Sequence, residues 1–132
     1  MSLFVDTSAL YALLVATEAD HLAVKQRFAA EAERGRRMVT TNYVVLEATA
    51  LLQHRIGLDP VRDLDARILP LLNIVFVDAA LHRRGVSRLL TLDRRRVSLV
   101  DVVSFELMDA ESIEEVLGLD DDFTAAGFRV LP

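Results

Sequence analysis

Three acidic residues each stand alone in a long, mainly apolar stretch of the chain. Asp6 is the only charged residue between residues 1 and 17, Glu47 the only one between 38 and 52, and Asp101 the only one between 97 and 105. Apolar stretches of this kind form the interior of a domain, and burying an ionised carboxylate there is costly unless a cation or a hydrogen-bonding partner compensates. We therefore expect the three acids to act together, with a shared metal ion as their simplest partner.

Composition limits the classes of protein that remain. The 132 residues are 52% hydrophobic, which suits one domain over residues 1–132 with a substantial core. The net charge of -5 argues against a general polyanion-binding surface but allows a local basic patch. The absence of cysteine excludes disulfides, thiol catalysis and cysteine-based zinc sites. With no signal peptide at the start and no uncharged run near the roughly 20 residues of a membrane span, we expect a soluble, cytoplasmic protein.

Short apolar segments alternate with helical ones along the chain. The pattern predicts strands at residues 2–5, 38–40, 74–77, 97–100 and 115–119, with an edge strand at 128–131. It predicts helices at 7–14, at 20–35, at 42–55 (apolar nearly all round and therefore buried), from Asp59-Pro60, from Asp78, and after Asp101 to about 108. This alternation is typical of an α/β fold with a short, mainly parallel central sheet flanked by helices on both faces.

The same topology predicts where the acids meet. Right-handed crossovers place the carboxyl ends of parallel strands along one edge of the sheet, where active sites form. Asp6, Asp101 and Asp120 each follow a predicted strand, and Glu47 can reach the same edge from about one turn into its helix. We expect one acidic site there.

Carboxylates without histidine or cysteine form a hard, oxygen-only site that suits magnesium or manganese. Such a metal can orient a phosphodiester and lower the pKa of a bound water, which is nuclease chemistry. Ordinary structural interpretations remain open: Asp6 and Asp101 can cap helices, and Glu47 can pair with a buried arginine. The run from Asp120 to Asp122 can be a solvated loop, in which Asp120, just after Leu119, is the better ligand candidate.

Four segments, in order, resemble the motifs of the PIN-domain family: residues 4–10 (FVDTSAL), 41–47 (TNYVVLE), 98–105 (SLVDVVSF) and 120–128 (DDDFTAAGF). The resemblance spans essentially the whole chain, and its order, spacing and length are similar to those of small VapC-type toxins. It implies a PIN-like fold and a magnesium- or manganese-dependent endoribonuclease that cleaves RNA. It also implies a homodimer, with the apolar early helices as candidate interface, and a cognate antitoxin protein that neutralises the toxin.

The resemblance also assigns residues to the site. Asp6, Glu47 and Asp101 take the places of the first three family acids, Asp120 that of the fourth, and Asp122 that of an additional metal ligand. Gly118 stands where a threonine is often found. Thr7, Ser8 and Ser104 resemble the hydroxyl residues that orient the acids or a metal-bound water, although helix capping accounts for them equally well.

Arginines supply the candidate contacts to RNA. Arg94, Arg95 and Arg96 precede the Asp101 segment and can hold flanking phosphates, with solvated side chains as the alternative.

A non-catalytic PIN-fold module that binds RNA or protein is the main alternative function. A phosphoacceptor domain would need adjacent acids on the first strand and a late lysine, and an aspartyl phosphatase would need Asp-x-Asp where the chain has Asp6-Thr7-Ser8.

Overall fold

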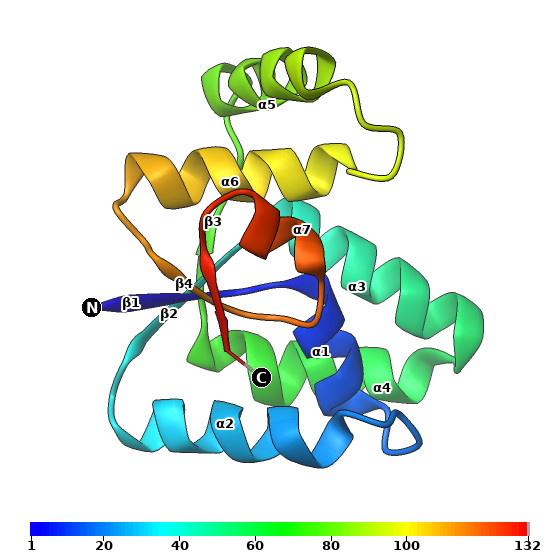
Figure 1. The fold of residues 1–132 in the computed structure, drawn as a ribbon. Coiled ribbons are helices and arrows are strands. Elements are labelled where there is room, and N and C mark those ends of the chain that lie inside the picture. Colours follow the sequence, from blue (N-terminus) through cyan, green and yellow to red (C-terminus); the bar gives the residue numbers. More distant parts are fainter. Residues whose placement is uncertain (132) are drawn as a thin grey trace.

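The structure, a computed structural model that describes residues 1–131, places five strands in one parallel central sheet (Figure 1). The strand order is β3-β2-β1-β4-β5, and every neighbouring pair is parallel. The strands are β1 (Ser2–Val5), β2 (Arg37–Thr41), β3 (Asn73–Val75), β4 (Glu115–Leu117) and β5 (Arg129–Leu131). The predicted α/β fold with a short parallel sheet is confirmed.

Helices cover both faces of this sheet. They are α1 (Thr7–Leu14), α2 (His21–Glu33), α3 (Asn42–Arg55), α4 (Leu58–Asp63), α5 (Ala79–Leu92), α6 (Leu99–Ala110) and α7 (Asp121–Ala125); a π-helical turn (Leu64–Ile68) and a 3₁₀ turn (Leu69–Leu71) follow α4. In Figure 1, α5 and α6 lie on one side of the sheet and α2 and α4 on the other. None of the helices within residues 1–131 is long and apolar enough to cross a membrane.

The direction of winding reverses at the centre of the sheet. From β1 the chain first adds β2 and β3 on one side, and later returns to add β4 and β5 on the other. In open α/β sheets, ligands bind in the crevice beyond the carboxyl ends of the strands at such a reversal, here between β1 and β4. Asp6 directly follows β1, and its backbone N–H donates to the carbonyl of Leu117, the last residue of β4 (3.0 Å). The fold therefore joins the two strand ends at the point where an active site is expected.

An aromatic cluster packs the later helices against the sheet. The Phe105 ring of α6 meets the Phe123 ring of α7 edge to face, with centroids 4.9 Å apart, and lies 5.7 Å from that of Phe128. Phe123 also lies next to Phe4 of β1, which is completely buried. Because Phe105 shares a helix with Asp101 and α7 directly follows Asp120, this packing positions both acids relative to the sheet.

The strand predicted at residues 97–100 is wrong. This segment is the start of α6, with Ser98 as its N-cap: the Ser98 hydroxyl accepts from the Asp101 backbone N–H, and the Asp101 carboxylate accepts from the Ser98 backbone N–H, both at 3.1 Å. This reciprocal pair is a capping box, which satisfies two donors that a helix start otherwise leaves free. Asp101 therefore lies in the first turn of a helix and does not follow a strand.

The prediction that the helix at 42–55 is buried all round is also wrong. Only Val44, Ala48 and Leu52 of α3 are buried, whereas Leu46 is 69% exposed. Spacings of four residues place the buried side chains on one face of the helix, and that face alone packs on the rest of the protein. The apolar outer face of α3 is open in the single chain.

Two smaller predictions also need correction. Helix α4 begins at Leu58 with Gly57 as its N-cap, so Asp59 and Pro60 lie within its first turn instead of capping it. The sequence pattern places Leu22, Ala23, Phe28 and Ala29 near one face of the helix predicted at 20–35. Of these four only Phe28 is buried in α2, together with Val24 and Glu31.

Candidate active site

The acids predicted from the sequence meet in one pocket of about 420 Å³ at the carboxyl ends of the strands. Asp6, Glu47, Asp101 and Asp120 all line it. Asp6 comes from the end of β1, Glu47 from the second turn of α3, Asp101 from the first turn of α6, and Asp120 from the N-cap of α7. The other lining residues are Thr7, Ser8, Tyr11, Glu18, Leu51, Arg55, Arg96, Ser98 and Leu119.

Only one of the two carboxylate oxygens of Asp6 has a hydrogen-bond partner. It occupies the N-cap position of α1, but its carboxylate caps no backbone N–H group of the helix. The Ser8 hydroxyl donates to Oδ2 of Asp6 (3.1 Å), while Oδ1 is buried without any hydrogen-bond partner. The helix-capping interpretation therefore does not explain this side chain, and a buried carboxylate oxygen without a partner is rare in proteins.

Ser8 also fixes the loop that carries Asp120. Its Oγ accepts from the backbone N–H of Leu119 (2.9 Å) while donating to Asp6. Gly118 makes this close approach possible, because a Cβ at position 118 would lie 3.3 Å from the Cβ of Asp6 and 3.4 Å from Oγ of Ser8. The glycine thus brings the loop close to β1, so that Asp120 reaches the pocket.

Three carboxylates form the tightest group of the site. Asp101, Asp120 and Asp122 each offer one oxygen, and these atoms all lie within 4.8 Å of one another. Asp101 uses Oδ2 for the capping box, and Oδ1 of Asp120 accepts from the Asp122 backbone N–H (3.0 Å). Each of these two side chains keeps a second oxygen free of these capping bonds. Asp120 to Asp122 is therefore a folded helix start and not an open solvated loop.

Glu47 is half-buried at the edge of the same pocket. No ion pair or hydrogen bond involves its carboxylate anywhere in residues 1–131, so the structure does not support its pairing with a buried arginine. Its charge nevertheless acts on Asp101, whose pKa it helps to raise. Glu47 thus faces the other acids with both carboxylate oxygens available.

Burial and mutual repulsion perturb the acids strongly. Burial, followed by the nearby charge of Asp101, raises the pKa of Asp6 to about 7. Burial raises the pKa of Asp101 to about 6, with the charges of Asp120 and Glu47 adding to the effect and the Ser98 N–H opposing it. The pKa of Asp122 is also raised, by burial and then by the charge of Asp120, while Arg94 opposes the rise. Carboxylates that raise one another's pKa in one pocket are typical of functional sites.

The donors present fit a divalent cation of the magnesium or manganese type. They are carboxylate oxygens from several elements, without histidine or cysteine, which is the ligand chemistry these hard ions prefer. A cation would also supply the missing partner of Asp6 Oδ1 and remove the repulsion among the acids. Asp101 and Asp120, which line the pocket and belong to the close group of three, and Asp6, whose Oδ1 lacks a partner, are the residues that would hold it, with Asp122 and Glu47 beside them.

The predicted hydroxyl residues divide into two groups. Thr7 and Ser8 line the pocket, and Oγ1 of the buried Thr7 has no hydrogen-bond partner. Ser104, by contrast, does not line it: its hydroxyl donates to the Val100 carbonyl within α6 (2.8 Å). This intrahelical hydrogen bond is common for serine in helices, and the supporting role predicted for Ser104 stays a prediction.

The three predicted arginines also occupy different places. Arg96 lines the acidic pocket. Arg94 lines a smaller neighbouring hollow together with Asp122, and Arg95 is exposed and lines neither. Of the three, Arg96 therefore lines the pocket of the four acids, whereas Arg94 lies near Asp122, whose pKa its charge lowers.

The side chains at this pocket that sequence reasoning missed include Glu18, Tyr11 of α1 and Arg55 of α3. A helical signal was available for Arg55. Glu47, Leu51 and Arg55 are spaced four residues apart, which places them along one side of a helix, and all three line the pocket. No comparable signal marked Tyr11, because its contact with α3 depends on how the two helices pack.

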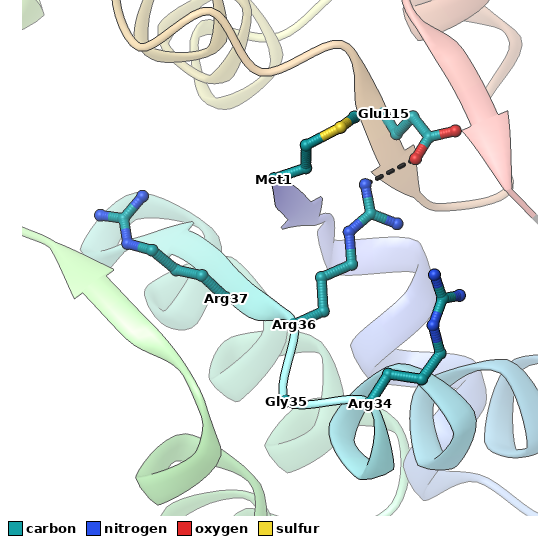
Figure 2. A pocket seen from close by; sticks show the side chains of 6 residues that line it. All are labelled: Met1, Arg34, Gly35, Arg36, Arg37 and Glu115. Carbon is teal, nitrogen blue, oxygen red and sulfur yellow. Dashed lines mark hydrogen bonds and ion pairs between the residues drawn. The ribbon is translucent and has the colours of Figure 1, made fainter.

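A somewhat larger hollow, of about 540 Å³, lies at the opposite edge of the sheet, where the strands begin. Figure 2 shows its lining, with Arg36 reaching from the start of β2 to Glu115 at the start of β4. The Arg36 guanidinium also pairs with Glu31 (3.3 Å), which is 1% exposed and was not predicted to be buried; Arg34 pairs with Glu31 as well, and Arg37 pairs with Glu111. Because its charges neutralise one another, this hollow is a structural ion-pair cluster and not a competing active site.

Comparison with known proteins agrees with this geometry. The model of the PIN domain family matches residues 3–129. The chain belongs to the PIN-domain family. The PIN domain described here is 33% identical over 127 residues to the 23S rRNA-specific endonuclease VapC20 of Mycobacterium tuberculosis, covering 96% of this chain and 95% of that protein. The resemblance to PIN domains and VapC-type toxins that the sequence motifs indicated is thereby confirmed.

Solved structures show the same fold. The crystal structure of Mycobacterium tuberculosis VapC20, described as a sarcin-ricin loop cleaving toxin, superposes on this PIN domain with a TM-score of 0.86 at 32% identity, covering 96% of this chain and 95% of that one. FitAcB from Neisseria gonorrhoeae gives a TM-score of 0.70 at 19% identity, covering 100% and 97% of the two chains. The first likeness spans nearly the whole of both chains, so the acidic pocket belongs to the part of the fold that they share.

Proposed function

We propose that this PIN domain is a metal-dependent endoribonuclease and the toxin of a toxin-antitoxin pair. The observation that carries this proposal is the convergence of Asp6, Glu47, Asp101 and Asp120, from four separate elements, in one pocket that also holds an unpartnered buried carboxylate oxygen. Such a group of acids is destabilising without a cation and suits phosphodiester hydrolysis with one. The relative named as a 23S rRNA-specific endonuclease supports RNA as the substrate.

Each group of the pocket has a separate task in this mechanism. Asp6, Asp101 and Asp120 would hold Mg²⁺ or Mn²⁺, which would stabilise the charge on the phosphodiester and lower the pKa of a water molecule. Glu47 has free carboxylate oxygens and can accept a proton from the attacking water. Arg96 binds the phosphate from the rim of the pocket. Ser8 bonds both Asp6 and the backbone of Leu119, so it keeps the loop of Asp120 against β1 and holds Asp120 in the same pocket as Asp6.

The test is cleavage of RNA by the purified protein. Cleavage should require Mg²⁺ or Mn²⁺, stop with EDTA, and fall by a factor of roughly 100 or more in Asp101→Asn, because a metal ligand is lost. Asp65→Asn, an exposed aspartate outside the pocket, is the matched control and should cleave normally. Cleavage without metal, or at full rate in Asp101→Asn, would contradict the mechanism. RNA binding without cleavage under every metal condition would favour the non-catalytic alternative.

A structured loop of large-subunit ribosomal RNA is the first substrate to test. The proposal rests on the named activity of the relative and on its described cleavage of the sarcin-ricin loop. A labelled RNA hairpin that carries this loop should be cut at one position, whereas the corresponding DNA hairpin should not. Uniform cutting of unrelated RNA at equal rates would support the nuclease and exclude this substrate.

Inhibition by an antitoxin segment follows from the same electrostatics. We infer that an arginine or lysine of the antitoxin enters the acidic pocket, because a cation there offsets the repulsion between the acids and excludes the metal. Binding of the antitoxin and of Mn²⁺ would then weaken each other by the same factor. Antitoxin affinity that is unchanged both by saturating Mn²⁺ and by Asp6→Asn would place inhibition elsewhere.

A homodimer, with the exposed apolar face of α3 in its interface, remains a proposal that light scattering can test.

A further inference from the structure

The acidic pocket extends along α3 beyond the acids. Glu47, Leu51 and Arg55 all line it, and Arg55 is the last residue of the helix. At the rise of an α-helix, Arg55 lies about 12 Å along the axis from Glu47. This separation leaves room for a ligand to extend from the acids toward Arg55, so that a part of the ligand beside the phosphodiester at the acids can contact Arg55.

Arg55 is held over an aromatic ring. Its guanidinium carbon lies 5.4 Å from the centre of the Tyr11 ring. Tyr11 is half-buried and packs against the core from α1, so it is a fixed support, whereas Arg55 is exposed. An arginine placed over a tyrosine face is attracted by the ring, which limits its motion without neutralising its charge.

The charge of Arg55 is available to a ligand. No ion pair involves Arg55 within residues 1–131, although Glu18 lines the same pocket. Most arginines elsewhere in the molecule differ: Arg36 and Arg88, for example, are each tied to two carboxylates. Arg55 and Arg96 are the two arginines that line the pocket, and they come from different elements.

We propose that Arg55, supported by Tyr11, binds an unpaired nucleotide next to the scissile phosphodiester, with its guanidinium plane stacked on the base and its charge facing a phosphate. The proposal rests on the ribonuclease function proposed above. Unpaired RNA bases stack on arginine planes and aromatic rings, and arginine combines this stacking with phosphate binding in a way that lysine does not. Arg55 is thus the contact residue, and Tyr11 is a positioning residue that acts through it.

The charge of the pocket favours RNA over an acidic peptide as the occupant. A peptide carboxylate at Arg55 would lie in a pocket lined by five acidic side chains and would gain nothing from them. An RNA strand reaches both ends of the pocket at once, with one phosphodiester at the acids and their cation and the next nucleotide at Arg55. The charge of Arg55 then offsets the repulsion between the flanking phosphate and the acids.

The test compares cleavage of a labelled RNA loop by wild type, Arg55→Ala, Arg55→Lys and Arg67→Ala under single-turnover conditions in Mg²⁺. Arg67 is exposed and lies outside the pocket, so Arg67→Ala controls for the loss of one positive charge. Arg55→Ala should raise the half-saturating protein concentration by roughly tenfold, the effect of losing one stacked base, with little change in the rate at saturation. Arg55→Lys should recover only part of this loss, and thermal melting should be the same for all four proteins.

Substrates with one base removed at each position near the cleavage site complete the test. If Arg55 stacks on a base, the effect of Arg55→Ala should disappear for one abasic position and persist for the others. An equal effect at every position would overturn the stacking proposal and leave a charge effect alone. Equal saturation curves for Arg55→Ala and Arg67→Ala, with metal-dependent cleavage intact, would overturn the whole subsite. Absence of cleavage by the wild type would instead contradict the proposed function.

Discussion

Replacing Asp6 by asparagine should make the stability of the metal-free protein much less dependent on pH. Burial and the charge of Asp101 raise the pKa of Asp6 from its ordinary 3.8 to about 7 in the folded protein. Between these values the folded protein keeps a proton on Asp6 that the unfolded chain has released. The unfolded state therefore binds fewer protons, and the free energy of unfolding falls as the pH rises through this window.

The size of this effect follows from the pKa and the burial of the side chain. Each pH unit between the two pKa values corresponds to about 1.4 kcal/mol, so ionisation of Asp6 removes about 4 kcal/mol of stability between roughly pH 4 and pH 7. Solvent screening reduces this little, because Asp6 is 3% exposed. Asparagine has nearly the same shape, cannot ionise, and keeps an oxygen that can accept from Ser8. The free energy of unfolding of Asp6→Asn should therefore lack this part of the pH dependence.

Urea unfolding in EDTA at a series of pH values measures the difference directly. The stability of Asp6→Asn relative to wild type should increase by about 4 kcal/mol from pH 4 to pH 7.5. Asp65→Asn should track the wild type, because Asp65 is exposed. Saturating Mg²⁺ should remove most of the difference, since a cation favours the ionised carboxylate. If the free energies of unfolding of wild type and Asp6→Asn changed with pH in parallel, Asp6 would not have the raised pKa expected of a buried carboxylate close to other acids, and the argument for the metal site would fail.

Three further predictions concern the metal and the packing. Mn²⁺ should raise the melting temperature of the wild type, and should do so much less for Asp101→Asn, as differential scanning fluorimetry can show. Glu31→Gln should lower the free energy of unfolding by about 2 kcal/mol or more, because Arg36 loses a buried charged partner. Gly85→Ala should destabilise by about 1 to 3 kcal/mol despite the better helix propensity of alanine, because its Cβ would lie 2.5 Å from Cγ2 of Val103.

Each of these outcomes has a clear opposite. Equal metal-induced shifts in wild type and Asp101→Asn would place the cation elsewhere. Unfolding of Glu31→Gln at the wild-type urea concentration would mean that the ion-pair cluster at the start of the strands adds no stability. A stabilised Gly85→Ala would show that α5 can shift away from α6 without cost.

The sheet and the meeting point of the acids could be predicted because they follow from simple periodicity. Apolar segments in alternation with helices require a parallel sheet, and its winding fixes the edge at which residues after β1 and β4 meet. This pattern alone was enough to predict that Asp6, Glu47 and Asp120 lie in one site. Their surroundings depended on local geometry that the pattern does not contain, such as the double hydrogen bond of Ser8 and the space left by Gly118.

The errors have identifiable physical causes. The segment at 97–100 has the β-branched, apolar character of a strand, but Ser98 and Asp101 carry the spacing of a capping box, and the helix start that they stabilise prevails over the apolar pattern. The exposed face of α3 and the buried Glu31 depend on which elements pack together, and a single sequence does not reveal such long-range contacts. For the same reason Tyr11 beside Arg55 was found only in the structure.

Titration of the protein with Mn²⁺, followed by the electron paramagnetic resonance signal of the free ion, tests the central claim most directly. If the acids form one metal centre, the wild type should remove Mn²⁺ from solution, and Asp6→Asn, Asp101→Asn and Asp120→Asn should each bind it roughly tenfold or more weakly, while Asp65→Asn binds normally. Cleavage of RNA should rise with the same Mn²⁺ dependence as binding. Equal Mn²⁺ affinity in wild type and all three pocket variants would contradict a shared centre at these carboxylates.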